Sequence, residues 1–150
     1  MPETPVQVLL VEDNPNDVEL TLQAFRRNNV TEGIHVARDG AEALDFLFCT
    51  GAHAGRDPAS GPRLILLDLK LPKVDGLEVL RRVKADPQTR AIPLVVLTSS
   101  SQERDVAESY RSGANSYLVK PIDFNRLRDA VRSIVAYWLA LNEPPLRRAA

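Results

Sequence analysis

The sequence lacks paired cysteines, an appreciable net charge and any long hydrophobic run. A single cysteine in 150 residues allows no internal disulfide framework. The 19 Lys and Arg residues nearly balance the 20 Asp and Glu residues, so composition gives no reason to expect a nucleic-acid partner. No apolar run approaches the roughly 20 residues needed to cross a bilayer, and no basic region precedes an apolar stretch at the start. These absences exclude a membrane protein and a disulfide-stapled secreted module, and they predict a cytoplasmic domain.

Short apolar runs alternate with helical patterns along the chain. Each run is continuously apolar and rich in branched residues, which is typical of strands covered on both faces. The clear runs are 6–11, 64–67 and 93–97; the run at 116–119 is less strong, and 34–37 is a weaker fifth candidate. Asn14, Asp39 and Asp123 stand where helix N-caps are expected. Five strand-helix alternations predict parallel strands with helices on both faces, a three-layer α/β sandwich.

The remaining segments complete a one-domain interpretation with a core at about 6–140. Residues 50–62 are rich in Gly, Ala, Pro and Ser, which predicts a long surface loop, and 142–150 reads as a frayed tail. Val106, Ala107 and Tyr110 mark the fourth helix, which Gly113 would cap.

Carboxylates, a hydroxyl and an amine stand at the ends of the predicted strands. Glu12 and Asp13 follow the first strand, Asp68 the third, Thr98 the fourth and Lys120 the fifth. Sites in open parallel sheets form outside the carboxyl ends of the strands, so these groups should converge. Two carboxylates about 5 Å apart repel by about 3 kcal/mol at an effective dielectric of 20. The lysine and a Mg²⁺ ion would supply the missing positive charge, which makes a set of groups suited to phosphoryl transfer.

Four motifs together resemble the receiver domain of two-component response regulators. They are Val-Leu-Leu-Val-Glu-Asp-Asn at 8–14, Leu-Leu-Asp-Leu-Lys-Leu-Pro-Lys-Val-Asp-Gly at 66–76, Val-Leu-Thr-Ser-Ser at 96–100 and Ser-Tyr-Leu-Val-Lys-Pro at 116–121. Each motif alone is modest, but all four in order at matched strand ends are specific. The resemblance implies a flavodoxin-like fold, with a five-stranded parallel sheet in the order 2-1-3-4-5 and five helices.

The resemblance also implies a chemical role for individual residues. Asp68 would accept a phosphoryl group from a histidine kinase, and Lys120 would pair with a phosphoryl oxygen. Thr98 would hydrogen-bond the phosphoryl group and move toward it, and Tyr117 would follow by swinging from exposed to buried. Such a protein is a phosphoacceptor in signalling and not an enzyme in the usual sense.

The same resemblance implies a magnesium site and structural residues around it. Asp13, Asp68 and the backbone carbonyl of Lys70 would bind Mg²⁺ directly, and Glu12 would act through water. The bond between Lys120 and Pro121 would be cis. Pro72 and Gly76 would shape the loop after the third strand.

A narrower likeness points to the small single-domain regulators paired with phytochrome-type light-sensing kinases. It rests on Asn-Pro-Asn-Asp-Val-Glu-Leu at 14–20, the long loop before the third strand and Tyr-Trp-Leu at 137–139. We expect no output domain to follow, so output would be protein binding. Val135, Trp138 and Leu139 could form a homodimer patch, or they could simply cover the core beneath the last helix.

Other interpretations stay open at this stage. The partner could belong to another two-component or chemotaxis-like pathway. A haloacid-dehalogenase-type phosphatase would need a second aspartate where Lys70 stands, and a mononucleotide-binding domain would need a glycine-rich loop after the first strand. His35 and His53 lack metal-ligand spacing with each other or with Cys49, so both read as structural or solvated.

Overall fold

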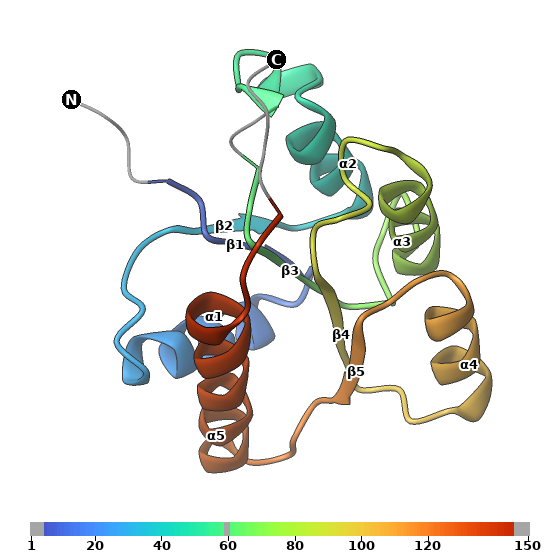
Figure 1. The fold of residues 1–150 in the computed structure, drawn as a ribbon. Helices are drawn as coiled ribbons and strands as arrows, with labels where there is room; N and C mark the ends of the chain where they lie inside the picture. The colour runs from blue at the N-terminus through green and yellow to red at the C-terminus, as the bar shows by residue number, and fades with distance from the viewer. Residues whose placement is uncertain (1–4, 59–60, 146–150) are drawn as a thin grey trace.

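A five-stranded parallel sheet forms the centre of the protein (Figure 1). The structure is a computed structural model that describes residues 5–58 and 61–145. The strand order is β2-β1-β3-β4-β5, as the resemblance to receiver domains implies. The strands are β1 (Val8–Val11), β2 (Ile34–Ala37), β3 (Leu64–Leu67), β4 (Leu94–Thr98) and β5 (Ser116–Val119).

Five α-helices cover the two faces of the sheet. They are α1 (Pro15–Arg27), α2 (Gly40–Phe48), α3 (Gly76–Ala85), α4 (Glu103–Arg111) and α5 (Phe124–Ile134). Figure 1 shows α1 beside α5 on one face, with α2, α3 and α4 on the other, so the predicted three-layer sandwich is confirmed. Two short helices complete the described chain, a 3₁₀ turn η1 (Gly51–His53) and a π-helical turn η3 (Val135–Leu141). No described helix is both long and apolar enough to span a membrane.

Side-chain caps fix where several helices begin, and they were predicted correctly. Oδ1 of Asn14 accepts hydrogen bonds from the backbone N–H groups of Asn16 and Asp17 at the start of α1. Asp39 accepts from the N–H of Glu42, and Asp123 caps α5 in the same way. These bonds satisfy donors that would otherwise lack partners at a helix start. The first cap also sets α1 directly behind the end of β1, where the acidic residues lie.

The core has two apolar layers, one on each side of the sheet. Every residue of β1, β3 and β4 is buried, because helices cover both faces of these strands. The fourth helix packs differently from the pattern that marks it in the sequence. Ala107 and Tyr110 are exposed, Val106 is half-buried, and Ser109 is the residue that α4 buries. The helix is confirmed, but its inward face is more polar and smaller than its apolar residues suggest.

The C-terminal segment lies over the core beside α5. Val135, Trp138 and Leu139 are partly buried against the apolar layer beneath α5, which fits their alternative interpretation as a core cover. The guanidinium of Arg63, immediately before β3, donates to the backbone carbonyls of Leu139 (2.9 Å) and Asn142 (3.2 Å). Arg63 therefore holds the end of η3 against the start of β3, and Asp68 lies at the other end of that strand. Residues 146–150 of the expected tail and 59–60 of the expected loop lie outside the described residues.

Candidate functional site

The polar residues predicted at the strand ends meet around Asp68, directly after β3. Its Oδ1 accepts a hydrogen bond from the hydroxyl of Thr98 at 2.8 Å and from the backbone N–H of Lys70 at 3.3 Å. Its Oδ2 lies 2.9 Å from Nζ of Lys120. Asp68 is 8% exposed, so the carboxylate is both firmly held and still reachable from solvent.

Lys120 links the ends of three elements. Besides Asp68, its ammonium contacts the carboxylates of Glu12 after β1 and of Asp17 in the first turn of α1. The backbone N–H of Lys120 donates to the carbonyl of Thr98 at 2.7 Å, which continues the pairing of β5 with β4. Burial alone would lower the pKa of Lys120, but the surrounding carboxylates outweigh burial and raise it. The lysine is therefore charged at neutral pH.

Too little positive charge surrounds these carboxylates. Burial and, to a lesser extent, the negative charge of Asp68 raise the pKa of Glu12 to about 7 against the lowering effect of Lys120. Burial would also raise the pKa of Asp68, but the ammonium of Lys120 and the hydroxyl of Thr98 bring it below the usual value. One ammonium stabilises the anion of Asp68 and leaves Glu12 only partly ionised near neutral pH.

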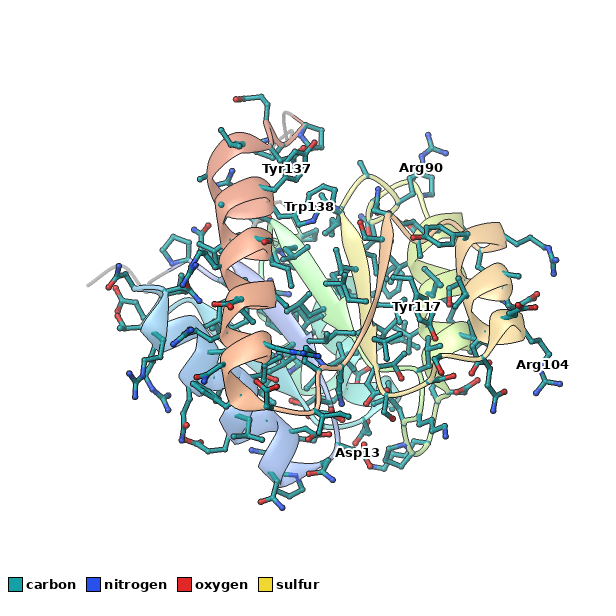
Figure 2. The ribbon with its side chains drawn as sticks, turned by 90° about the horizontal axis from the view of Figure 1, so that it is seen from below. Asp13, Arg90, Arg104, Tyr117, Tyr137 and Trp138 are labelled. Carbon is teal, nitrogen blue, oxygen red and sulfur yellow. The ribbon has the colours of Figure 1, made fainter. Side chains whose placement is uncertain are left out.

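Asp13 occupies the outer rim of the cluster. It follows buried Glu12 and is exposed, and Figure 2 shows it at the end of the sheet opposite Tyr137 and Trp138. The backbone N–H of Asp13 donates to Oε2 of Glu12 at 2.9 Å, so the two acidic residues hold one loop conformation. The side chain of Asp13 is thus exposed, while its backbone is fixed beside the carboxylate of Glu12.

The hydroxyl side of the cluster continues toward α4. Thr98 is fully buried at the end of β4. Tyr117, on the α4 side of β5 (Figure 2), donates its phenolic hydrogen to the carbonyl of Ser100 at 2.9 Å. The hydroxyl of Ser100 in turn donates to Asp105 of α4 at 2.5 Å. Hydrogen bonds therefore connect the loop after β4 with both β5 and α4.

The loop after β3 approaches the site through its backbone. A Cβ at Gly76 would lie 2.5 Å from the carbonyl oxygen of Asp68, so only glycine lets α3 begin this close to the strand end. The carbonyl of Pro72 accepts from the N–H of Val74 at 2.8 Å and from that of Gly40 at 3.4 Å. The side chain of Lys70 is exposed. The loop between β3 and α3 is thus hydrogen-bonded to the first residue of α2.

The expected cis bond between Lys120 and Pro121 is wrong for this structure. No peptide bond among the described residues is cis. The trans form before proline is favoured by about 0.5–1 kcal/mol. Lys120 contacts the carboxylates of Glu12, Asp17 and Asp68 with a trans bond to Pro121.

Asp17 is the member of the cluster that sequence reasoning missed. Its Oδ2 lies 3.0 Å from Nζ of Lys120. The available signal was its place three residues after the cap Asn14, because the first turn of α1 begins at the same sheet edge. An acidic residue in a first turn normally reads as compensation of the helix dipole, which hid its second contact.

The comparisons with known proteins agree with this fold. The model of the response regulator receiver domain matches residues 8–132. The probable methanogenesis regulatory protein FilR2 of Methanothrix harundinacea is 46% identical over 143 residues, which cover 95% of this chain and 90% of that protein.

Two solved structures are similar over 95% of this chain and the whole of their own chains. The phosphorylated cyanobacterial phytochrome response regulator RcpA is 39% identical with a TM-score of 0.86. The bacteriophytochrome response regulator AtBRR is 50% identical with a TM-score of 0.74. Because the receiver model covers most of the chain and these relatives align along nearly all of it, the chain belongs to the response regulator receiver domain family.

Proposed function

We propose that the protein is a single-domain response regulator in which Asp68 accepts a phosphoryl group from a histidine kinase. The observation behind this proposal is the pair of donors on its carboxylate, the hydroxyl of Thr98 and the ammonium of Lys120. In the transfer, a carboxylate oxygen forms a bond to phosphorus while the phosphorus–nitrogen bond of the phosphohistidine breaks. The electron pair of that bond stays on the departing imidazole.

The residues around Asp68 fit a Mg²⁺ ion. Several carboxylates face one ammonium there, and hard oxygen donors suit a small divalent cation. Receiver domains bind divalent metal, and one solved structure is the Mn²⁺-bound form of the response regulator Rcp1. We propose that Asp13, Asp68 and the backbone carbonyl of Lys70 hold the ion directly, with Glu12 acting through water. The bound ion supplies positive charge against the phosphoryl oxygens.

Phosphorylation would change the hydrogen bonds of the groups that now hold Asp68. The new group adds negative charge and acceptor oxygens, so Thr98 and Lys120 gain a stronger acceptor than the carboxylate alone. The hydroxyl of Thr98 already donates to Asp68, and Tyr117 is already half-buried and bonded to the carbonyl of Ser100, so both residues would need only small movements. The segment from α4 to β5 would then shift toward a second conformation. The size of this shift is set by how much the phosphoryl group stabilises the second conformation relative to the first.

The similarity to phytochrome response regulators supports a phytochrome-type kinase as the partner. The relative named for methanogenesis regulation keeps another two-component pathway as the second candidate. A hydrolytic alternative lacks its general acid, because the position two residues after Asp68 is the lysine Lys70. Receiver domains are signalling phosphoacceptors, so the product of the reaction is a changed binding surface.

Labelling with a small phosphodonor and Mg²⁺ tests the acceptor. The wild type should gain one phosphoryl group per chain, measured by intact-protein mass, and Asp68→Asn should gain none. Asp75→Asn is the matched control, because Asp75 is an exposed aspartate in the loop after β3 and should label normally. Equal labelling of wild type and Asp68→Asn would remove Asp68 from the role.

Transfer rates from two purified kinases test the partner. A phytochrome-type kinase should phosphorylate the protein faster than a chemotaxis kinase at equal concentration, with both rates followed over the first turnovers. A faster rate from the chemotaxis kinase would support the second candidate.

We propose a homodimer as one form of output, through the face formed by α5 and η3. A groove of about 580 Å³ lies there, lined in part by Leu118, Ala130, Tyr137 and Trp138. Tyr137→Ser should shift sedimentation toward monomer, whereas Tyr110→Ser on α4 should not, although both tyrosines are 51% exposed. A wild type that sediments as a monomer at high concentration, phosphorylated or not, would end this proposal.

A further inference from the structure

Two histidines and a glutamate lie close together at the edge of the sheet formed by β2. His35 is in β2, Glu42 in the first turn of α2, and His53 in η1. One potential ligand atom from each residue can be chosen so that all three lie within 4.8 Å of one another. From the sequence alone, both histidines are interpreted as structural or solvated, because their spacing is not that of metal ligands. The fold, and not the spacing, brings the three elements together (Figure 1).

The two residues of the cluster on β2 and α2 are already held in place. Nε2 of His35 is 3.5 Å from Oε1 of Glu42. The other carboxylate oxygen, Oε2, accepts from the backbone N–H of Arg38 at 3.2 Å, so Oε1 is turned toward the histidine. Four ligands around Zn²⁺ at 2.0–2.1 Å stand about 3.4 Å apart, which is close to the observed separation.

The imidazole of His35 is positioned by aromatic contacts and not by a hydrogen bond at Nε2. Its ring stacks on Phe46 with centroids 4.3 Å apart, and the ring of His53 meets both edge-on at 5.1 Å. Within the described chain, Nε2 of His35 is buried without a hydrogen-bond partner. Its contact with Oε1 of Glu42 at 3.5 Å is longer than a hydrogen bond of normal geometry, so this nitrogen can take a further partner.

The protonation state also suits a metal. Burial lowers the pKa of His35, and the nearby His53 lowers it further against the attraction of Glu42. His35 is therefore neutral at pH 7 and can offer a lone pair. The side chains of His35 and Glu42 are 29% and 36% exposed, which leaves a path from solvent to the cluster.

We propose that His35, Glu42 and His53 form a binding site for a divalent d-block cation of the Zn²⁺ type. Two imidazoles and one carboxylate match such a cation, whereas Mg²⁺ prefers oxygen donors alone. A water molecule completes the fourth position. The site shares no residue with the acidic cluster, and His35 pairs with Leu9 inside β1 and not with the acidic residues after the end of that strand.

Metal binding would fasten the segment before β3 to the rest of the domain. His53 lies within the insert between α2 and β3, where its neighbours Ala52 and Ala54 are exposed. An adjustment of η1 toward the other two ligands would therefore displace little packed surface on either side of His53. A bound cation joins three elements that are far apart along the chain, and it should protect the insert from proteolysis.

Titration of the untagged protein with Zn²⁺ tests the site. The titration is done with Mg²⁺ in large excess, so that the acidic cluster is saturated with the harder ion. We expect one Zn²⁺ per chain, and about a tenfold or greater loss of affinity in His53→Ala and in Glu42→Gln. Copper(II) added to the same protein should give an electron paramagnetic resonance signal with nitrogen coupling, which His53→Ala reduces.

Two control variants separate this site from other acidic groups. Glu103→Gln, an exposed glutamate in the first turn of α4, and Asp13→Asn should both leave Zn²⁺ affinity unchanged. Circular dichroism shows whether each variant is folded. If His53→Ala does not fold, the Zn²⁺ affinity of Glu42→Gln tests the site. Equal Zn²⁺ affinity in wild type and Glu42→Gln, or loss of affinity in Asp13→Asn alone, would overturn the proposal.

Discussion

Strands β3 and β5 have the same length and lie in the same parallel sheet, yet they are packed very differently. All four residues of β3 are buried, whereas β5 has three half-buried residues and one exposed residue. The strand that leads to Asp68 is therefore fixed between two apolar layers, and the strand that leads to Lys120 lies at an edge beside the poorly buried α4. Low burial makes local rearrangement inexpensive, so the edge can move while the acceptor stays in place.

Truncation of one side chain in each strand should give the largest difference. Leu66→Ala removes a fully buried side chain from β3 and should lower the free energy of unfolding by about 3–5 kcal/mol. Val119→Ala in β5, where the side chain is 46% exposed, should change it by less than about 0.5 kcal/mol. Urea unfolding measures both values. Similar losses in the two variants would mean that β5 is as firmly packed as β3.

Removal of the ammonium group that joins the two strands should have the next largest effect. Lys120→Met leaves Glu12, Asp17 and Asp68 without their shared cation, so we expect a loss of about 2 kcal/mol at pH 7. The loss should shrink toward pH 5, because the carboxylates regain protons and their repulsion falls. A loss that is independent of pH would instead indicate packing by the lysine stem.

The raised pKa of Glu12 predicts a smaller, pH-dependent effect in the wild type. Between pH 4.5 and about 7 the folded chain keeps a proton on Glu12 that the unfolded chain has released, so stability falls as pH rises through this window. The change is about 1–3 kcal/mol. The lowered pKa of Asp68 acts in the opposite direction, but only when the pH falls below the usual value of 3.8.

Unfolding of wild type and Glu12→Gln at several pH values checks this effect. The variant should have a flatter profile between pH 4.5 and 7, since an amide does not titrate. Asp86→Asn, a change far from the cluster at the end of α3, should keep the slope of the wild type. Identical slopes in wild type and Glu12→Gln would place the titration elsewhere.

The smallest effect is expected from Tyr117→Phe, which removes the hydrogen bond to Ser100 at the edge. The phenol is half-buried, so the loss should be about 0.5–1 kcal/mol or less. Amide hydrogen exchange should nevertheless become faster in β5 and α4, with β3 unchanged. Faster exchange throughout the sheet would show that the edge and the centre open together.

The central strands and the helix starts could be predicted from the sequence, because each depends on local properties. A run such as Leu64–Leu67 is buried wherever helices cover both faces, and Asn14 caps its own helix. The acidic cluster could also be predicted, since it follows from the rule that parallel strands end at one edge. The four motifs together, at 8–14, 66–76, 96–100 and 116–121, added the resemblance to a known family.

Features that depend on contacts between distant elements could not be predicted in this way. Asp17 reads as a helix-dipole residue until Lys120 is found beside it. His35 and His53 come from different elements, so their meeting depends on how the insert before β3 folds back. The aromatic side chain and the spacing of Tyr110 favour a buried position, but the small Ser109 is the buried residue of α4.

The two hydrogen bonds from Arg63 set a practical limit on shortening the protein. A version that ends before Leu139 would lose both carbonyl acceptors and leave a half-buried guanidinium cation without them, next to the strand that leads to Asp68. Biosensors or fusion proteins built from this domain should therefore keep the chain through Asn142 before any linker begins.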